Sequence, residues 1–169
     1  DTRTSDSAAI RAMYYLPWKA SLRLEYRYFN DTWGIKASNY ELKLLQPIQD
    51  YLVLEGKFRA YQQTASTFYS DLFSVRDELN FRARDKEMST FSNNTIGIGA
   101  TFDIGKFFKW NTVDHNLLLN FFVDHMTFEY EDFRDVSVHD SSPGEYAAGQ
   151  EPLYTFDAQV YRLFLTYRY

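Results

Sequence analysis

Apolar and polar residues alternate with a period of two along most of the chain. Residues 161–169 show the pattern most completely, because one face carries only apolar and aromatic side chains while the other carries Arg, Thr and Phe. Successive side chains of a β-strand point to opposite faces, so this alternation predicts a strand with one wholly apolar face. That face consists of Tyr161, Leu163, Leu165, Tyr167 and Tyr169.

Six earlier segments share this period, and the sequence therefore predicts seven strands. The clearest is 21–28, where Leu and Tyr alternate with Arg and Glu; the others are 8–16, 39–44, 51–61, 86–102 and 115–131. Gly97 and Gly99 fall on the polar face of the fifth run, which indicates a close approach or a bend. The sixth run weakens in its second half, where Met126 and Phe128 fall on the polar face.

Short and long connections separate the runs. Residues 62–84 and 133–156 lack a sustained period and are expected to be long loops. Transmembrane β-barrels have short periplasmic turns and longer extracellular loops, so this alternation gives the chain a direction with its C-terminus in the periplasm. The expected short turns are at Pro17, at Pro47, at Gly105 and, on the side of the long loops, at Asn30-Asp31.

The predicted fold is an all-β, antiparallel transmembrane β-barrel, in which residues 1–169 form one domain or the C-terminal portion of one. Single-chain bacterial barrels use an even number of strands. Seven strands with a periplasmic C-terminus place Asp1 outside, so we expect the chain to be the C-terminal part of a larger barrel. The alternative is a complete barrel of eight strands, with the extra strand within 68–84.

Composition agrees with alternating strands. Aromatic residues make up 19% of the chain while the mean hydropathy is −0.46, so apolar rings are interleaved with polar residues. The longest apolar stretch, 117–123, is far shorter than the roughly 20 residues of a membrane-spanning helix. The chain has no Cys, which excludes disulfides and thiolate chemistry. Its charge of −5, with dispersed basic residues, argues against a nucleic-acid partner.

Charged residues of both signs occupy the polar face of the first four predicted strands. Arg or Lys on a lipid-exposed face near mid-bilayer costs about 2 to 4 kcal/mol, so in a barrel these side chains must face the lumen. They form either a structural ladder of cross-strand ion pairs or a functional lumen wall. Such a lumen is either water-filled, mildly basic and selective for anions, or plugged and bound to another protein. The residues are Arg11, Arg23, Glu25, Arg27, Glu41, Lys43, Glu55, Lys57 and Arg59.

Aromatic residues mark the rims and the first long loop. Trp18 and Trp110 lie at short turns, where an interfacial aromatic girdle is expected. The loop aromatics either pack the loop against the rim or form an exposed contact surface for a partner. They are Phe68, Tyr69, Phe73 and Phe81.

No catalytic or metal-binding motif is present. The three histidines His115, His125 and His139 have no metal-ligand spacing, and Asp124 and His125 point to opposite faces of a strand. No Gly-rich phosphate loop occurs, and none of the many serines is singled out as a nucleophile. We therefore predict no enzymatic activity, no cofactor and no metal.

Two features resemble known envelope proteins. The apolar terminal strand with its aromatic end is similar to the C-terminal signal of bacterial outer-membrane barrels. Four segments resemble, in order, the C-terminal half of an uncharacterised outer-membrane barrel family catalogued only as a domain of unknown function; they are residues 1–4, 26–35, 61–69 and 85–91.

This resemblance implies location and partners but no activity. It implies missing N-terminal strands, a place in the bacterial outer membrane, and contacts with outer-membrane lipid and, through the C-terminal strand, with the barrel-assembly machinery. The proteins that usually accompany this family imply partners among other envelope proteins, such as small lipoproteins and flavin-attaching enzymes. The expected function is a pore or an envelope scaffold; the alternatives are a closed structural or adhesin-like barrel and a soluble ligand-binding β-sandwich.

Overall fold

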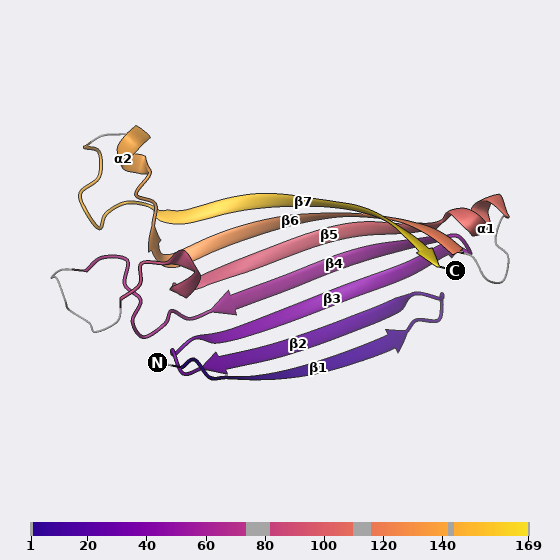
Figure 1. The fold of residues 1–169 in the computed structure, drawn as a ribbon, viewed down its shortest axis with the longest axis horizontal. Helices are drawn as coiled ribbons and strands as arrows, with labels where there is room; N and C mark the ends of the chain where they lie inside the picture. Colours follow the sequence, from indigo (N-terminus) through magenta and orange to yellow (C-terminus); the bar gives the residue numbers. More distant parts are fainter. Residues whose placement is uncertain (1, 74–81, 110–115, 142–143, 169) are drawn as a thin grey trace.

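Seven antiparallel strands form one open sheet, and each pairs with its neighbours along the chain, in the order β1-β2-β3-β4-β5-β6-β7 (Figure 1). This computed structural model describes residues 2–73, 82–109, 116–141 and 144–168. The predicted all-β fold with seven antiparallel strands is confirmed. The strands are β1 (Ser5–Tyr15), β2 (Ser21–Asp31), β3 (Lys36–Gln49), β4 (Leu52–Gln63), β5 (Phe91–Asp103), β6 (Asn116–Arg134) and β7 (Leu153–Arg168); the short helices are η1 (Lys86–Met88), α1 (Ile104–Phe108) and α2 (Val138–Ser141).

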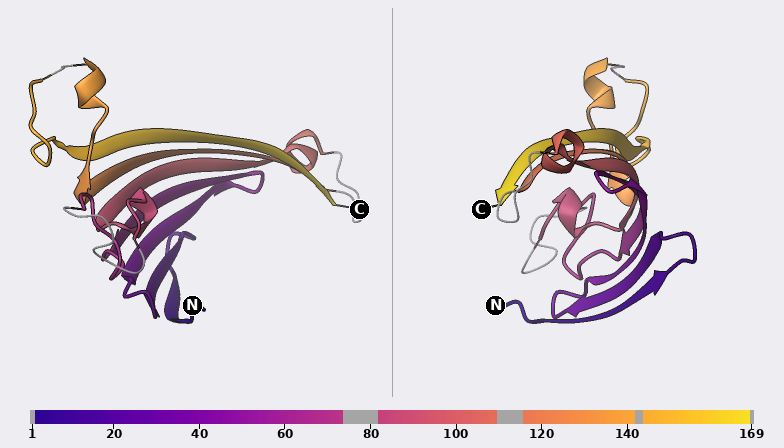
Figure 2. Two further views of the ribbon diagram at one scale, coloured as in Figure 1. Left: turned by 60° about the vertical axis from the view of Figure 1, so that its left-hand side comes forward. Right: turned by 90° about the vertical axis from the view of Figure 1, so that its right-hand side faces the viewer.

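The sheet is curved, and its first and last strands are not paired with each other. Figure 2 shows β1 and β7 at opposite margins of the curve, with the segment that contains η1 on the concave side. The turns after β1 and β3 lie at one end with α1 and the C-terminus, whereas the long connections after β4 and β6 lie at the other (Figure 1). None of the helices in the described part of the chain is long and apolar enough to cross a membrane.

Some strand ends differ from the prediction. β3 does not stop at Pro47 but continues to Gln49, with an irregular register at this point. Pro lacks the N–H that a regular ladder needs, and an irregularity near a strand end accommodates it. β6 and β7 are the longest strands because β7 begins at Leu153 rather than at Tyr161 and β6 extends to Arg134.

The connections also contain structure that the sequence did not predict. The expected turn at Gly105 is α1, where the Asp103 carboxylate accepts the N–H of Lys106 at 2.9 Å as an N-terminal cap. In residues 68–84 the described part forms no strand of the sheet; Tyr69 and Ala83 make only an isolated bridge. The eighth strand expected there as an alternative is therefore not found among the described residues.

In the middle strands the polar face of the sheet is more buried than the apolar face, whereas β1 is exposed along both faces. In β5, Asn93 and Thr95 are 4% and 1% exposed, whereas Ile96 and Ile98 are 62% and 68% exposed. The register carries the same two faces across all seven strands. This is the reverse of a water-soluble protein, in which large aliphatic residues are the ones most often buried. The buried hydrophobic residues among those described are only Ala20, Ile35, Ala37 and Tyr130.

At the loop end of the β6–β7 hairpin, the concave face becomes apolar and the opposite face becomes polar. Beyond Asp124, the concave face carries aromatic residues, and the rings of Phe128 and Phe156 stack with centroids 4.4 Å apart. The ammonium group of Lys86, in η1, lies 5.4 Å from the centroid of Phe156. The weak alternation in this part of the sequence thus has a structural cause, because the apolar residues pack against the loop that carries η1.

Asp31 organises the tight turn between β2 and β3, where the sequence predicts one. One oxygen of its buried carboxylate accepts the backbone N–H groups of Trp33 at 3.0 Å and Ile35 at 2.9 Å. The other oxygen accepts Nε of Arg3 at 2.7 Å. Asp31 therefore ties the segment before β1 to this turn.

Replacing Asp31 tests this role. Asp31→Ala should lower the free energy of unfolding by about 1 to 3 kcal/mol, because two backbone donors lose their acceptor. Denaturant unfolding followed by tryptophan fluorescence measures the change. Asp31→Asn keeps an oxygen for the backbone and should lose less. An Asn variant as unstable as the Ala variant would show that the contact with Arg3, and not the backbone bonds, supplies the stability.

Candidate functional site

All nine residues predicted to form a charged wall lie on the concave face of β1 to β4. One row across the four strands consists of Arg11, Glu25, Glu41 and Arg59. The next row toward the short turns consists of Arg23, Lys43 and Lys57. Arg27 lies on the loop side of these rows and Glu55 on the turn side. We call these nine residues the charged wall.

Glu25 is the centre of the first charge cluster in the wall. Its carboxylate lies 2.7 Å from Arg11, 3.0 Å from Arg23 and 3.0 Å from Arg27. The Glu25 side chain is 8% exposed, whereas the three arginines keep a third or more of their side-chain surface. Charge-assisted hydrogen bonds offset the loss of water around this carboxylate, and the cluster as a whole is positively charged.

The second cluster is centred on a lysine. The ammonium group of Lys43 lies 3.5 Å from Glu41 and 3.8 Å from Glu55. Beside it, Nε of Arg59 donates to the amide oxygen of Asn39 at 2.5 Å. Glu41 and Glu55 thus lie on either side of Lys43, which is directly opposite a second cation, Lys57, on β4.

The third cluster extends beyond the predicted wall and reaches β7. Asp124, 3% exposed, accepts Lys57 at 2.7 Å from one side and Arg162 at 2.6 Å from the other. The guanidinium of Arg162 also lies 5.4 Å from the ring centroid of Phe122. The sequence places Asp124 and Arg162 on polar strand faces, but only the register of four strands shows that they join Lys57.

Two glycines make the third cluster possible. Gly97 lies in β5 between Lys57 and Asp124, and a Cβ there would be 2.1 Å from a carboxylate oxygen of Asp124 and 3.0 Å from Cε of Lys57. A Cβ at Gly99 would be 2.2 Å from the ring of Phe122. The close approach predicted for these glycines is confirmed, because side chains from the neighbouring strands pass over both of them.

Two of the predicted loop aromatics, Phe68 and Tyr69, contact the rim of the sheet. Phe68 meets Trp33 edge to face at 5.3 Å, and the hydroxyl of Tyr69 donates to the carbonyl of Asp132 at 3.0 Å. Burial raises the pKa of Tyr69. Phe73 lies 5.5 Å from the guanidinium of Arg82. Phe81 lies outside the described residues, and a contact surface for a partner stays a prediction.

Asp71 holds this loop to the sheet. Its carboxylate lies 3.1 Å from Arg84 and 3.6 Å from Arg134, so it joins both arms of the loop to the end of β6. Arg84 also lies over the ring of Phe133, 5.1 Å from its centroid. No local pattern predicts this contact, since Asp71 and Arg134 are far apart along the chain.

Where the structure describes them, the predicted interfacial and terminal-strand residues are exposed. Trp18, in the turn after β1, is 61% exposed. The apolar residues of the terminal strand, Tyr161, Leu163, Leu165 and Tyr167, are each more than half exposed. Trp110 and Tyr169 lie outside the described residues. Their roles at a membrane interface and in insertion stay predictions.

The described histidines contact single carboxylates. His125 lies 3.9 Å from Asp157 on the exposed face, and His139 lies 2.8 Å from Glu151 in the loop before β7. The pKa of Glu151 is lowered, mainly by its hydrogen bond with His139. Over the part of the chain that the structure describes, no three His, Asp or Glu side chains gather as metal ligands. His115 lies outside that part.

Comparison with known families gives one match. The family model described as "Protein of unknown function (DUF3570)" matches residues 1–114, which is more than half of the chain. The chain belongs to this family. The DUF3570 match covers β1 to α1 and the whole charged wall, whereas β6 and β7 lie beyond it. No curated protein and no solved structure matches the chain.

A pair of glycine variants tests the third cluster. Gly97→Ala should lower the free energy of unfolding by about 1 to 3 kcal/mol, because its Cβ forces Asp124 away from Lys57. The matched control is Gly56→Ala on the other face of β4, where a Cβ would meet nothing within 4 Å. The control should be neutral or slightly stabilising. Denaturant midpoints measure both, and equal effects of the two substitutions would contradict the clearance argument.

Proposed function

We propose that this sheet is the wall of an outer-membrane β-barrel, with the charged wall facing the interior and the apolar face in contact with lipid. The observation that carries the proposal is the reversed burial: polar side chains are covered and large apolar ones are exposed along the same strands. In water such a surface is unfavourable. In a bilayer such a surface is favourable because lipid surrounds it. Outer-membrane barrels have this arrangement, with apolar residues outward and polar residues inward.

The exposed face has a continuous uncharged band. Over the described middle sections of the seven strands, its side chains are Ala, Leu, Ile, Val, Phe and Tyr, with Gly56, and no Asp, Glu, Lys or Arg occurs. The band contains about four residues of each strand, which corresponds to roughly 20 Å along the strands. No second layer of described residues covers it, which favours the barrel over the soluble sandwich.

The open margins of the sheet support closure by further strands. The outer edges of β1 and β7 carry backbone groups that no strand of the described residues pairs. A membrane provides no water to satisfy such groups, and closed barrels are the β-structures that avoid free edges. We therefore propose that additional strands join β7 to β1 in a larger, even-stranded barrel. The short turns and the C-terminus then lie in the periplasm, and β7 is the strand offered to the barrel-assembly machinery.

In the proposed barrel the concave face is the interior, and this interior is basic, which favours a pore for anions. Away from the strand ends, the concave face has more basic side chains than carboxylates. The basic ones are Arg11, Arg23, Arg27, Lys43, Lys57, Arg59 and Arg162, and the carboxylates are Glu25, Glu41, Glu55 and Asp124. The second candidate is an envelope scaffold with a filled interior. It is favoured by the segment with η1, which occupies the concave side at the loop end (Figure 2).

Site-directed spin labels test which face meets lipid. The chain has no Cys, so single-Cys variants at Arg27 and Tyr28 can be labelled without background. After reconstitution into vesicles, the label at Tyr28 should be relaxed mainly by oxygen and the label at Arg27 mainly by a water-soluble nickel complex. Reversed accessibilities would contradict the proposed facing, and water accessibility at both positions would contradict membrane insertion.

Conductance separates the pore from the scaffold. In planar bilayers a pore should give discrete conductance steps, and under a KCl gradient its reversal potential should favour chloride. Arg27→Gln should lower the chloride preference, because Glu25 keeps Arg11 and Arg23 while one interior cation is lost. The control is Tyr28→Phe on the opposite face, which should leave selectivity unchanged. An inserted protein without conductance would support the scaffold.

A further inference from the structure

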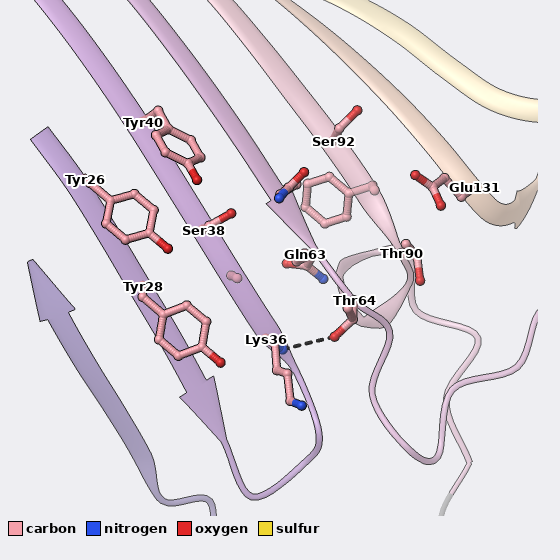
Figure 3. Close-up of a pocket in the computed structure, with 13 residues that line it drawn as sticks. Tyr26, Tyr28, Lys36, Ser38, Tyr40, Gln63, Thr64, Thr90, Ser92 and Glu131 are labelled. Carbon is pink, nitrogen blue, oxygen red and sulfur yellow. Dashed lines mark hydrogen bonds between the residues drawn. The ribbon is translucent and has the colours of Figure 1, made fainter.

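A hollow of about 510 Å³ lies on the exposed face at the loop end of the sheet (Figure 3). Its lining comes from β2 to β6 and from the residues next to β4 and β5. The hollow lies outside the charged wall, on the opposite face of the same strands. Its volume is within the range of small-molecule binding sites, which is about 300 to 1,000 Å³.

Three tyrosines form one side of the hollow. The rings of Tyr26 and Tyr40 lie 4.7 Å apart, and Tyr28 continues the group toward the loop end. Figure 3 shows that the hydroxyl groups of all three point toward the loop end, away from the apolar middle of the sheet. Aromatic rings with a polar tip in this orientation are suited to a boundary between an apolar and an aqueous region.

Polar side chains form the other side of the hollow. Lys36, at the start of β3, is exposed, and its backbone N–H donates to the hydroxyl of Thr64 at 3.0 Å. Ser38 and Ser92 add hydroxyl groups, and Figure 3 shows them on the same face as the tyrosines. The hollow therefore combines ring faces, several hydroxyl groups and an ammonium group, and the carboxylate of Glu131 lies on its β6 side, away from Lys36 (Figure 3).

The hollow borders directly on the uncharged band. Toward the short turns, Tyr40 is followed on the same face of β3 by Leu42 and Leu44, and Phe58 lies beside Leu42 on β4. These side chains are each 39% exposed or more. A ligand held in the hollow therefore has its polar part among hydroxyl and ammonium groups and its apolar part over the leucines.

We infer that the hollow binds the phosphorylated sugar headgroup of an outer-leaflet glycolipid, with its acyl chains along the uncharged band. Ring faces stack on the C–H faces of sugars, hydroxyl groups exchange hydrogen bonds with sugar hydroxyls, and the ammonium group of Lys36 pairs with phosphate. A glycerophospholipid offers the phosphate but not the sugar. This inference rests on the proposed function, because it needs the exposed face to lie in lipid.

Binding of purified lipid A, a phosphorylated sugar dimer with acyl chains, tests the inference. With the whole protein in detergent micelles, lipid A should bind more tightly than phosphatidylglycerol, which has a phosphate and no sugar. The double variant Tyr28→Ala with Lys36→Ala should raise the Kd for lipid A about tenfold, the equivalent of about 1.4 kcal/mol. The matched control, Tyr14→Ala, removes an exposed tyrosine at the other end of the same face and should leave the Kd unchanged.

Three outcomes overturn the inference. Equal binding of lipid A and phosphatidylglycerol would show that the sugar is not recognised. An unchanged Kd in the double variant would show that the lipid binds elsewhere. A lipid-accessible spin label at Leu42, in the uncharged band, combined with either result would reject only the glycolipid site, whereas a water-accessible label there would reject the membrane proposal together with it.

Discussion

The ion pair between Lys57 and Asp124 crosses over β5, and the packing of the concave face depends on contacts of this kind. Asp124 is nearly fully buried, and a buried carboxylate without a cation is strongly destabilising. It is held from both sides by cations of β4 and β7, and Gly97 provides the space between them. Since four strands contribute to this one cluster, it fixes their register as well as their charge balance. The three clusters together pair the charges of the concave face, so that these polar side chains can pack against one another without an apolar core.

The two ends of the sheet differ in which of their faces is apolar. In the middle and toward the short turns, apolar residues point outward and charges are paired inside. At the loop end of the β6–β7 hairpin, Met126 and Phe128 lie on the concave side and Phe128 stacks on Phe156, while His125 and Asp157 face outward. The second arrangement is that of a water-exposed structure with a small apolar cluster. The proposed membrane therefore ends, along β6 and β7, at the level where the apolar residues change from the outer face to the concave face.

Strict alternation made the fold predictable, and its loss made the remainder hard to predict. The period of two located all seven strands and placed the nine charged residues on one face. It missed the first part of β7 because the apolar residues there, such as Phe156, lie on the opposite face from Leu163. Asp124 and Arg162 had the correct face, but their meeting with Lys57 depends on the register across β4 to β7, which no local pattern encodes. Likewise, the hollow beside Tyr28 is formed by residues from β2 to β6, and the sequence separates them widely.

The simple strand order has a consequence for how the sheet is built. Every strand pairs only with the strands next to it in sequence, so no strand has to be inserted between two that are already paired. Closing a loop between adjacent strands requires little conformational entropy when the connection is short, as after β1, β2 and β3. The hairpins of β1 to β4 therefore close at the smallest entropic cost, and the long connections after β4 and β6 close at the largest. The conformational cost of building the sheet is thus concentrated at the two places where β5 and β7 are added.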